Sequence, residues 1–175
     1  MDHNYIAQFE NVKVRPLLVE DIEQLRIWRN DTVKTKFLRK LDYITPEMQL
    51  QWYKNYLNNP TEIVFAIEEI DTLHRMVGSV ALYDIKNGQA EIGKIQIGDD
   101  EAHGKGVGRK ALKLVSEIGF RELNLTKIYA SVHQQNIASH KNFTNLGFKI
   151  VGRHVSHVGG FEDEFEITAQ ELFKK

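Results

Sequence analysis

The chain has 175 residues, with 23 Lys and Arg against 24 Asp and Glu, and it contains no cysteine. This length fits a single domain over residues 1–175, because domains commonly run to about 100–200 residues. The missing cysteine excludes disulfides, thiolate catalysis and cysteine-type zinc sites, and it agrees with a reducing compartment. The near-zero net charge argues against a dedicated nucleic-acid-binding protein.

The N-terminal stretch has no positively charged start leading into an apolar run, and no later segment is long and apolar enough to span a membrane. We therefore expect neither export nor a membrane span, and we expect a cytoplasmic location.

The chain first predicts a strand and a helix. The stretch NVKVRPL alternates and stops at Pro16, which is typical of a strand. A helix is expected from about Val19 to Asn30, because apolar residues recur there at a spacing of three. The residues of that apolar face are Ile22, Leu25 and Trp28.

A second helix is expected to begin at Thr45 and Pro46. The threonine hydroxyl would cap the helix, and proline is favoured at the first helical position. Its expected buried stripe consists of Met48, Trp52, Tyr56 and Leu57.

From Glu62 the pattern favours strands. The runs EIVFAIEE, MVGSVALYD and QAEIGKIQI are rich in β-forming residues and are separated by short polar turns. The turn KNG, from Lys86 to Gly88, is a strong hairpin signal. Three neighbouring antiparallel strands are therefore expected.

The last part of the chain predicts two more helices and three more strands. A helix period begins near Val107, TKIYASV follows as a strand, and IASHKNFTNLGF forms a helix that ends at Gly147. KIVGRHV and FEDEFEIT then close the chain as a strand pair. The expected fold is one mixed α/β (α+β) domain, with a largely antiparallel sheet flanked by helices. The apolar residues of the first of these helices are Val107, Ala111, Leu114, Val115 and Ile118.

The stretch DDEAHGKGVGRKAL combines glycines and cations at a junction between strand and helix. Glycine permits a positive φ and lets a ligand approach the main chain, so successive amides can form a concave nest that favours anions. The start of the following helix adds unpaired amides and a positive dipole end. A phosphate or pyrophosphate is the ligand that this pattern favours, and the alternative is a plain turn with solvated cations. The residues concerned are Gly104, Lys105, Gly106, Gly108 and Arg109.

Two common phosphate loops do not match this stretch. A P-loop requires G-x-x-x-x-G-K-[ST], and no hydroxyl residue follows Lys110. A dinucleotide fingerprint requires G-x-G-x-x-G directly after a parallel strand, whereas the spacing here is G-x-G-x-G. ATP, NAD and FAD are therefore disfavoured.

The same stretch resembles the acyl-CoA-binding motif of the GNAT superfamily of N-acetyltransferases, usually written [RQ]-x-x-G-x-[GA]. Here the motif runs from His103 to Gly108. The later stretch ASVHQQNIASHKNFTNLGFKIVGR resembles the second signature of the superfamily, with Asn136, Ser139 and the run 146–148 in the matching places. The similarity covers nearly the whole chain and is greatest to ribosomal-protein-alanine, spermidine and certain nucleotide-amino-sugar acetyltransferases.

The resemblance implies acetyl-CoA as the cofactor. The glycine-rich amides would hold the pyrophosphate, one strand would pair with the pantetheine arm through its main chain, and Asn136 would help to hold that arm. His103 departs from the usual Arg or Gln, and it is either a ligand through its amide or a plain exposed loop residue. The implied cofactor-binding residues are Ile95, Gln96, Ile97, His103, Gly104, Lys105, Gly106, Val107, Gly108, Arg109 and Asn136.

The implied reaction is direct attack of a neutral amine on the acetyl thioester within a ternary complex. An alkylamine with a pKa of about 10.4 is charged at neutral pH, so deprotonating it costs about 4.6 kcal/mol. Glu91 is our candidate base, and its alternative reading is an exposed strand-edge carboxylate. In this superfamily a tyrosine often serves as the general acid, but the matching position here holds Phe143. Ser139 is our candidate for that role, and the alternative is that its hydroxyl bonds the helix backbone. A main-chain amide near Ile97 would polarise the thioester oxygen.

The acceptor pocket of this superfamily is built in the first third of the chain, which implies Trp28, Arg29, Asn30 and Trp52 as substrate-binding residues. Both tryptophans also fit plain core positions. His140 is expected to face solvent. His154 and His157 lie three apart on a strand, face opposite sides and are not expected to share a metal.

These observations give an acetyl-CoA-dependent N-acetyltransferase that acts on a primary amine, such as a peptide N-terminus, a polyamine or another small amine. An amino-sugar acetyltransferase and a CoA-binding module without catalysis remain as alternatives. No metal, nucleic acid or membrane partner is expected, and a homodimer is among the expectations.

Overall fold

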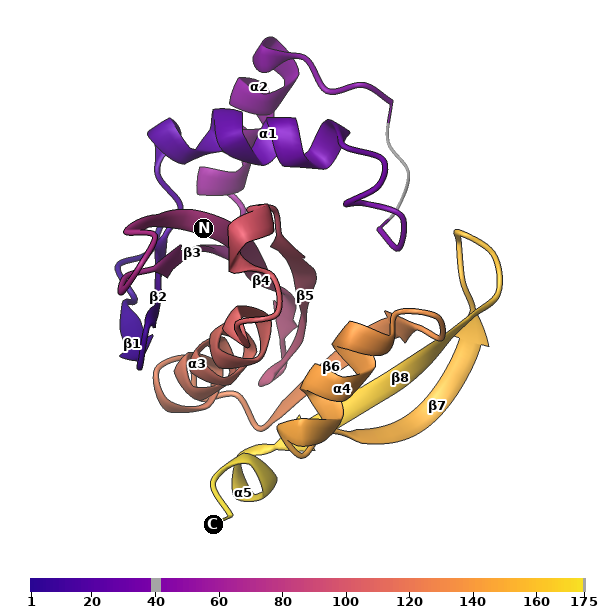
Figure 1. The fold of residues 1–175 in the computed structure, drawn as a ribbon. Coiled ribbons are helices and arrows are strands. Elements are labelled where there is room, and N and C mark those ends of the chain that lie inside the picture. Colours follow the sequence, from indigo (N-terminus) through magenta and orange to yellow (C-terminus); the bar gives the residue numbers. More distant parts are fainter. Residues whose placement is uncertain (39–41, 175) are drawn as a thin grey trace.

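The computed structural model describes residues 1–38 and 42–174 (Figure 1). Its centre is an eight-stranded sheet with the order β1-β2-β3-β4-β5-β6-β8-β7. All neighbouring strands pair antiparallel except β5 and β6, which pair parallel. The strands are β1 (Ala7–Phe9), β2 (Val12–Pro16), β3 (Ile63–Glu69), β4 (Arg75–Lys86), β5 (Gln89–Ile97), β6 (Lys127–His133), β7 (Lys149–Val155) and β8 (Phe161–Thr168).

Helices cover both faces of this sheet, as Figure 1 shows: α1 and α2 lie together over one face, and α3 and α4 lie on the other. Short 3-10 turns precede α1 and α3. In residues 1–38 and 42–174, no helix is long and apolar enough to cross a membrane. The helices are α1 (Ile22–Asn30), α2 (Pro46–Leu57), α3 (Val107–Arg121), α4 (Ile137–Asn145) and α5 (Ala169–Leu172), and the 3-10 turns are η1 (Val19–Asp21) and η2 (Asp100–Ala102).

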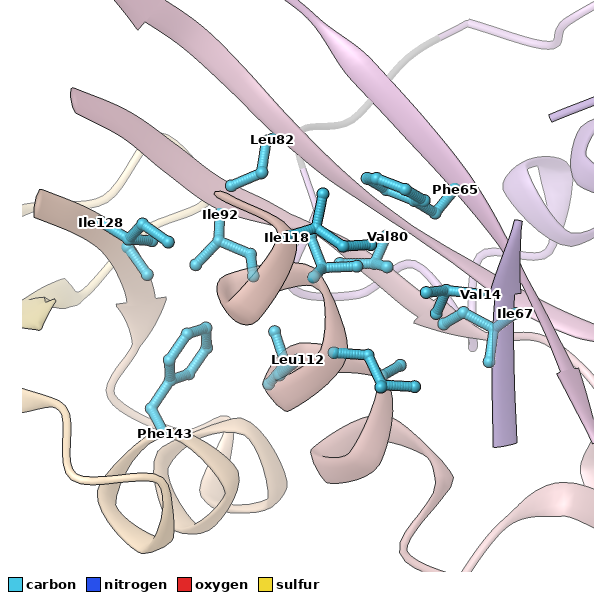
Figure 2. Close-up of a cluster of buried hydrophobic side chains, with 14 of the residues drawn as sticks. Val14, Phe65, Ile67, Val80, Leu82, Ile92, Leu112, Ile118, Ile128 and Phe143 are labelled. Atoms are coloured by element: carbon cyan, nitrogen blue, oxygen red, sulfur yellow. The ribbon is translucent and has the colours of Figure 1, made fainter. Parts of the chain in front are cut away.

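The sheet has a core on each face because its central strands are apolar on both sides. Along β3, Phe65 and Ile67 face one core and Val64 and Ala66 face the other, as the two-residue side-chain period requires. The larger core lies against α3 and α4, and Figure 2 shows ten of its residues labelled. These are Val14, Phe65, Ile67, Val80, Leu82, Ile92, Leu112, Ile118, Ile128 and Phe143.

The predicted hairpin is confirmed. Strand β4 ends at Lys86 and β5 begins at Gln89, so the connection is Asn87 and Gly88. Both residues have positive φ, 52° and 71°, which matches the two-residue hairpin turn that asparagine and glycine favour.

The sheet opens at its centre, on the outer side of β5. Strands β5 and β6 are paired only where Gln89–Glu91 face Lys127–Tyr129. Beyond that point β5 continues to Ile97, and no strand within residues 1–38 and 42–174 pairs with it on this side. A bulge bends β5 there, because two residues of β4 span three of β5 between Gln96 and Gly93, and Lys94 takes a φ of +50°.

The expected fold class is confirmed, and the elements agree except at the edges. The first helix begins at Ile22 rather than Val19, because Asp21 accepts the Leu18 N–H and pairs with Arg15, which tightens the preceding turn. Met48 is 52% exposed rather than buried, because it lies in the first turn of α2, where it lines a cavity instead of packing in the core. Strand β1 and helix α5 had no counterpart among the expected elements.

Candidate active site

The glycine turn between β5 and α3 has the conformation that a nest of amides needs. Gly104 and Gly106 take φ of +74° and +71°, and Gly106 caps α3 in the left-handed region. A Cβ at Gly104 would meet nothing within 4 Å, so the position needs glycine for its backbone angle rather than for space.

The amides of this turn are available to a ligand. Within residues 1–38 and 42–174, no hydrogen bond uses the backbone N–H of residues 104–109, and the first amide of the helix that does bond is that of Lys110, to Gly106. Lys105 and Arg109 are exposed beside them. Unpaired amides at a helix start together with two cations form a site for an anion, so these residues fit a pyrophosphate.

His103 ties this turn to the open edge of β5. Its Nε2 lies 2.9 Å from the main-chain oxygen of Ile97, which makes Nε2 the donor. Because the Gly98 N–H bonds Val77 on β4, the alternation of an antiparallel ladder turns the main chain of Ile97 away from β4. His103 is exposed, as one of its two expected roles requires, and its ring has a defined partner in Ile97.

The three strand residues expected to line the cofactor have different surroundings. Ile95 and Ile97 pack with half-buried side chains against the larger core. The Gln96 side chain is buried and donates to the main-chain oxygen of Trp28 at 2.9 Å. These side chains therefore have partners inside the protein, and the main-chain edge of the stretch is open on the side away from β4.

A cavity of about 630 Å³ lies between α1, α2 and the sheet. Its walls come from five parts of the chain: the two helices, the connection between them, the face of β3 to β5, the end of β6, and the turn before β8. The lining residues are Leu25, Arg29, Phe37, Leu38, Ile44, Met48, Gln49, Trp52, Glu62, Val64, Ser79, Ala81, Tyr83, Glu91, Gly93, Lys94, Gln96, Ser131, His133, His157, Val158 and Glu162.

Glu91 is one of these lining residues and lies at the root of the opening between β5 and β6. Burial raises the pKa of its carboxyl group, and the nearby carboxylates of Asp84 and Glu162 raise it further. A hydrogen bond from Tyr83 and the charge of Lys94 act in the opposite direction. A half-buried carboxylate with a raised pKa in a cleft is a good acceptor of a proton near neutral pH.

The other charged groups of the cavity are nearly balanced. Lys94 pairs with Glu62 across the floor. Burial lowers the pKa of the Arg29 guanidinium, which projects from α1 into the same space. Three lining carboxylates, those of Glu62, Glu91 and Glu162, thus share the cavity with two cations.

The four residues expected to bind the acceptor divide into two pairs. Arg29 and Trp52 line the cavity, and Trp52 also stacks on Tyr56. Trp28 is only 6% exposed and packs over Gly98, where a Cβ would come within 2.0 Å of its ring, so it is a core residue. Asn30 is a structural link, because its amide exchanges two hydrogen bonds with the main chain of Ile44.

Asn136 and Ser139 meet at the start of α4. The Asn136 side chain accepts the Ser139 N–H at 3.2 Å and caps the helix. Ser139 is half-buried and lies outside the cavity lining, whereas Phe143, one helical turn further on, is buried in the core. The acid role expected for Ser139 stays a prediction.

The histidines behave differently from one another. His140 was expected to face solvent, but its ring packs edge-on against Phe165 and its Nε2 lies 3.7 Å from Asp163. His154 pairs with carboxylates of β8, while His157 lines the cavity. His154 lies on β7 but His157 lies in the turn after it, so the expectation that both lie on one strand was wrong.

Three cavity residues had no role in the sequence-based reading. Tyr83 lies opposite Glu91 in the β4–β5 register, and Phe37 stacks on His133 with ring centroids 5.2 Å apart. His133 in turn donates through Nε2 to the main-chain oxygen of Gly159 at 2.7 Å, and its Nδ1 accepts the Gln135 N–H. This histidine thus joins the connection after α1 to the turn before β8 at one end of the cavity.

The chain matches the family described as acetyltransferase (GNAT) domain over residues 11–149. It is 32% identical to a probable N-acetyltransferase of Bacillus subtilis over 165 residues, covering 88% of this chain and 91% of that protein. It is 31% identical to an uncharacterised protein of Methanocaldococcus jannaschii over 149 residues, which is 82% of this chain but only 29% of that longer protein.

The fold is also that of solved acetyltransferases. A spermidine N-acetyltransferase from Vibrio cholerae, crystallised with CoA and spermine, superposes with a TM-score of 0.85 at 21% identity over 95% of this chain and all of that chain. The glycine turn, the open edge of β5 and most of the residues that line the cavity, including Glu91, fall within the matched residues 11–149. The chain therefore belongs to the GNAT acetyltransferase family, whose domain transfers an acetyl group from acetyl-CoA to an amine.

Proposed function

We propose that Glu91 is the general base for acetyl transfer to a primary amine bound in the cavity. The observation that carries this proposal is the position of Glu91, which lines the cavity and also stands at the point where β5 loses its second partner strand. Its carboxylate takes a proton from the ammonium form of the acceptor, directly or through water, and so makes the neutral nucleophile.

The acyl donor has a fitting site on the other side of that opening. Acetyl-CoA, when bound, supplies the acetyl thioester. The unpaired amides of residues 104–109 and the charges of Lys105 and Arg109 hold its pyrophosphate, and the main-chain edge at Ile95–Ile97 holds its pantetheine arm. His103 fixes the turn to this edge through Ile97.

The charge balance of the cavity favours a compact acceptor. Three carboxylates face Arg29 and Lys94, so the net charge is small and cannot neutralise a long polycation. The apolar wall, which includes Phe37, Ile44 and Trp52, suits an acceptor with an apolar or ring-shaped body. We therefore expect a peptide N-terminus, a small amine or an amino sugar to react faster than spermidine.

The test is release of free CoA thiol from acetyl-CoA with a panel of acceptors: N-terminal peptides, spermidine, amino acids and amino sugars. Turnover with at least one compact amine is expected, and Glu91→Gln should slow it about 100-fold or more at neutral pH. Glu122→Gln, an exposed residue at the end of α3, is the matched control and should leave the rate unchanged.

Two outcomes would count against this assignment. If Glu91→Gln turns over as fast as the wild type, Glu91 is not the base. If spermidine is the best acceptor, the expected preference for compact amines is wrong. A calorimetric titration with CoA serves as a check that each variant still binds the donor.

The cellular location and the oligomeric state also remain proposals. The absence of cysteine agrees with a cytoplasmic location. A homodimer is proposed on the exposed apolar residues of the edge strand β7, Val151 and Val155, and sedimentation would test it.

A further inference from the structure

We infer that Tyr83 is a positioning residue for Glu91, and that Gly93 is glycine in order to leave room for the tyrosine hydroxyl. This inference rests on the proposed function, in which Glu91 is the base. It deepens that function by naming what holds the carboxylate in place.

The register of the sheet puts Glu91 between two tyrosines. Tyr83 on β4 is its antiparallel partner, and Tyr129 on β6 is its parallel partner. Directly opposed residues of neighbouring strands project on the same face, so all three side chains share the face of the sheet that carries the cavity. Tyr83 lines the cavity together with Glu91, and its hydroxyl acts to lower the pKa of that carboxyl group, against the effect of burial.

Gly93 marks where the tyrosine hydroxyl lies. A Cβ built on Gly93 would come within 2.8 Å of the Tyr83 hydroxyl oxygen and 3.2 Å of the ring carbon Cε1. The φ of Gly93 is not in the left-handed region, so the backbone does not require glycine here. The space above Gly93 is taken up by the tyrosine, and any larger residue would push the hydroxyl from its position.

The Tyr83 ring has a second contact. The Lys94 ammonium lies 4.6 Å from the ring centroid, in the range of a cation–π contact. Lys94 is itself paired with Glu62, which is largely buried at the start of β3. The ring is thus held between its neighbours, which keeps its hydroxyl over Gly93, two residues along β5 from Glu91.

The charged groups around Glu91 show why a hydrogen-bond donor beside its carboxylate would matter. Asp84 on β4 and Glu162 on β8 both repel a negative charge at Glu91, while Lys94 attracts one. Arg29, His133 and His157 line the same cavity from other elements. Burial raises the pKa of the Tyr83 hydroxyl far above its ordinary value, so Tyr83 remains a donor throughout the working pH range. A donor that never ionises stabilises the carboxylate form of Glu91, which is the form that can act as a base.

The first test is Tyr83→Phe, which keeps the ring and removes only the hydroxyl. A hydrogen bond to a charged group contributes enough to predict a fall in kcat of about 10-fold at neutral pH, with little change in KM for acetyl-CoA. Without the donor, the pKa of Glu91 rises. The acid limb of the pH–rate profile should therefore move to higher pH, and the loss should shrink as the pH rises.

The second test is Gly93→Ala, which keeps the tyrosine but crowds its hydroxyl. It should move the acid limb in the same direction as Tyr83→Phe. In the double variant Tyr83→Phe/Gly93→Ala the two effects should not add, because both act through one hydrogen bond. Tyr129→Phe is the matched control: it flanks Glu91 equally closely in register, and its pH profile should match the wild type.

A background lacking the base separates this inference from the proposed function. In Glu91→Gln, adding Tyr83→Phe should change the residual rate less than about 2-fold. If Glu91→Gln is slow while Tyr83→Phe and Gly93→Ala keep the wild-type rate and pH profile, Tyr83 has no positioning role although the base stands. If Glu91→Gln is as fast as the wild type, the proposed base itself is wrong.

Discussion

The Nε2 atom of His103 lies 2.9 Å from the main-chain oxygen of Ile97, so one imidazole joins the glycine turn to the exposed edge of β5. His103→Ala removes this link. A neutral hydrogen bond contributes about 0.5–1.5 kcal/mol net, which predicts a loss of CoA affinity of about 2- to 12-fold with kcat preserved. Isothermal titration with CoA measures the affinity.

Glutamine at this position provides the rescue for the His103 prediction. His103→Gln keeps a donor that can reach the same carbonyl, and it should bind CoA as tightly as the wild type. His74→Asn, in another exposed turn, is the neutral control. Equal weakening by the alanine and glutamine variants would show that the link to Ile97 does not matter for binding.

Gly106→Val should abolish measurable CoA binding while the protein still folds. The φ of +71° at Gly106 strains any β-branched residue, by about 1–3 kcal/mol, and the new side chain would stand next to the unpaired amides that we propose hold the pyrophosphate. Gly159→Val is the matched control, because Gly159 also has a positive φ, +91°, and open space around it. Both variants should lose a similar amount of thermal stability, but only Gly106→Val should lose CoA; retained binding by that variant would contradict the nest.

Glu91→Gln should lose the most activity at low pH and progressively less at high pH, because alkaline solution supplies the neutral amine without a base. The rate should be followed from about pH 6 to pH 10 with a fixed acceptor, a range that spans the ordinary pKa of an alkylamine. A loss that stays constant with pH would mean that Glu91 positions the acceptor rather than taking its proton.

The same substitution should stabilise the fold at neutral pH. Burial raises the pKa of Glu91 in the folded protein, so the folded state binds the proton more tightly than the unfolded state does. Wild-type stability therefore decreases as the pH rises through this folded pKa, and Glu91→Gln removes that decrease. The Tm of the variant should exceed that of the wild type at neutral pH, and the difference should vanish below about pH 4, the ordinary range of a glutamate. An unchanged Tm at neutral pH would contradict the raised pKa.

Glu69→Gln should destabilise the turn after β3. The fully buried Glu69 carboxylate accepts bonds from the Leu73 N–H, from the Thr72 main chain and hydroxyl, and from Asn11. Burial raises the pKa of this carboxyl group, but the hydrogen bonds outweigh burial and hold it well below its usual range. An amide cannot accept all of these bonds, so a loss of about 2 kcal/mol, or about 4–8 °C in Tm, is expected.

The stability that the Glu69 carboxylate contributes should depend on pH. A lowered folded pKa contributes stability that is present above the unfolded pKa of about 4.3 and is lost as the pH falls below it. The gap between wild type and Glu69→Gln should therefore narrow in acid. Glu20→Gln, at an exposed site, is the control. A gap that is the same at pH 3 and pH 7 would show that the charge of Glu69 is not what stabilises the turn.

Most of the fold could be predicted because its elements are marked by local patterns. Asn87 and Gly88 indicate the hairpin, and the apolar period that begins at Val107 indicates α3. The start of α1 could not be predicted, because it depends on the ion pair of Asp21 with Arg15, which belongs to β2. Such a contact exists only once the chain has folded.

The site was predictable where its chemistry depends on the backbone and not where it depends on register. The glycine turn is local, so its conformation follows from the residues in it. Regular pairing outward from Lys86 and Gln89 would put Tyr83 opposite Ile92, but a shift near Asp84, whose φ is +51°, puts it opposite Glu91. Likewise the spacing of Trp28 fits both a core and a pocket, and only the close approach of Gly98 distinguishes them.

The short pairing of β5 with β6 leaves backbone exposed to solvent in the middle of the sheet. Edge strands normally lie at the rim of a sheet, yet here a run of main chain between Ile92 and Ile97 is an edge in the interior of the strand order. Amides on that run should exchange with deuterated water far faster than those of β3 or β4 on the same sheet, and should slow when a ligand strand-pairs with them. A poorly protected stretch of backbone thus lies in the middle of the sheet rather than at its rim.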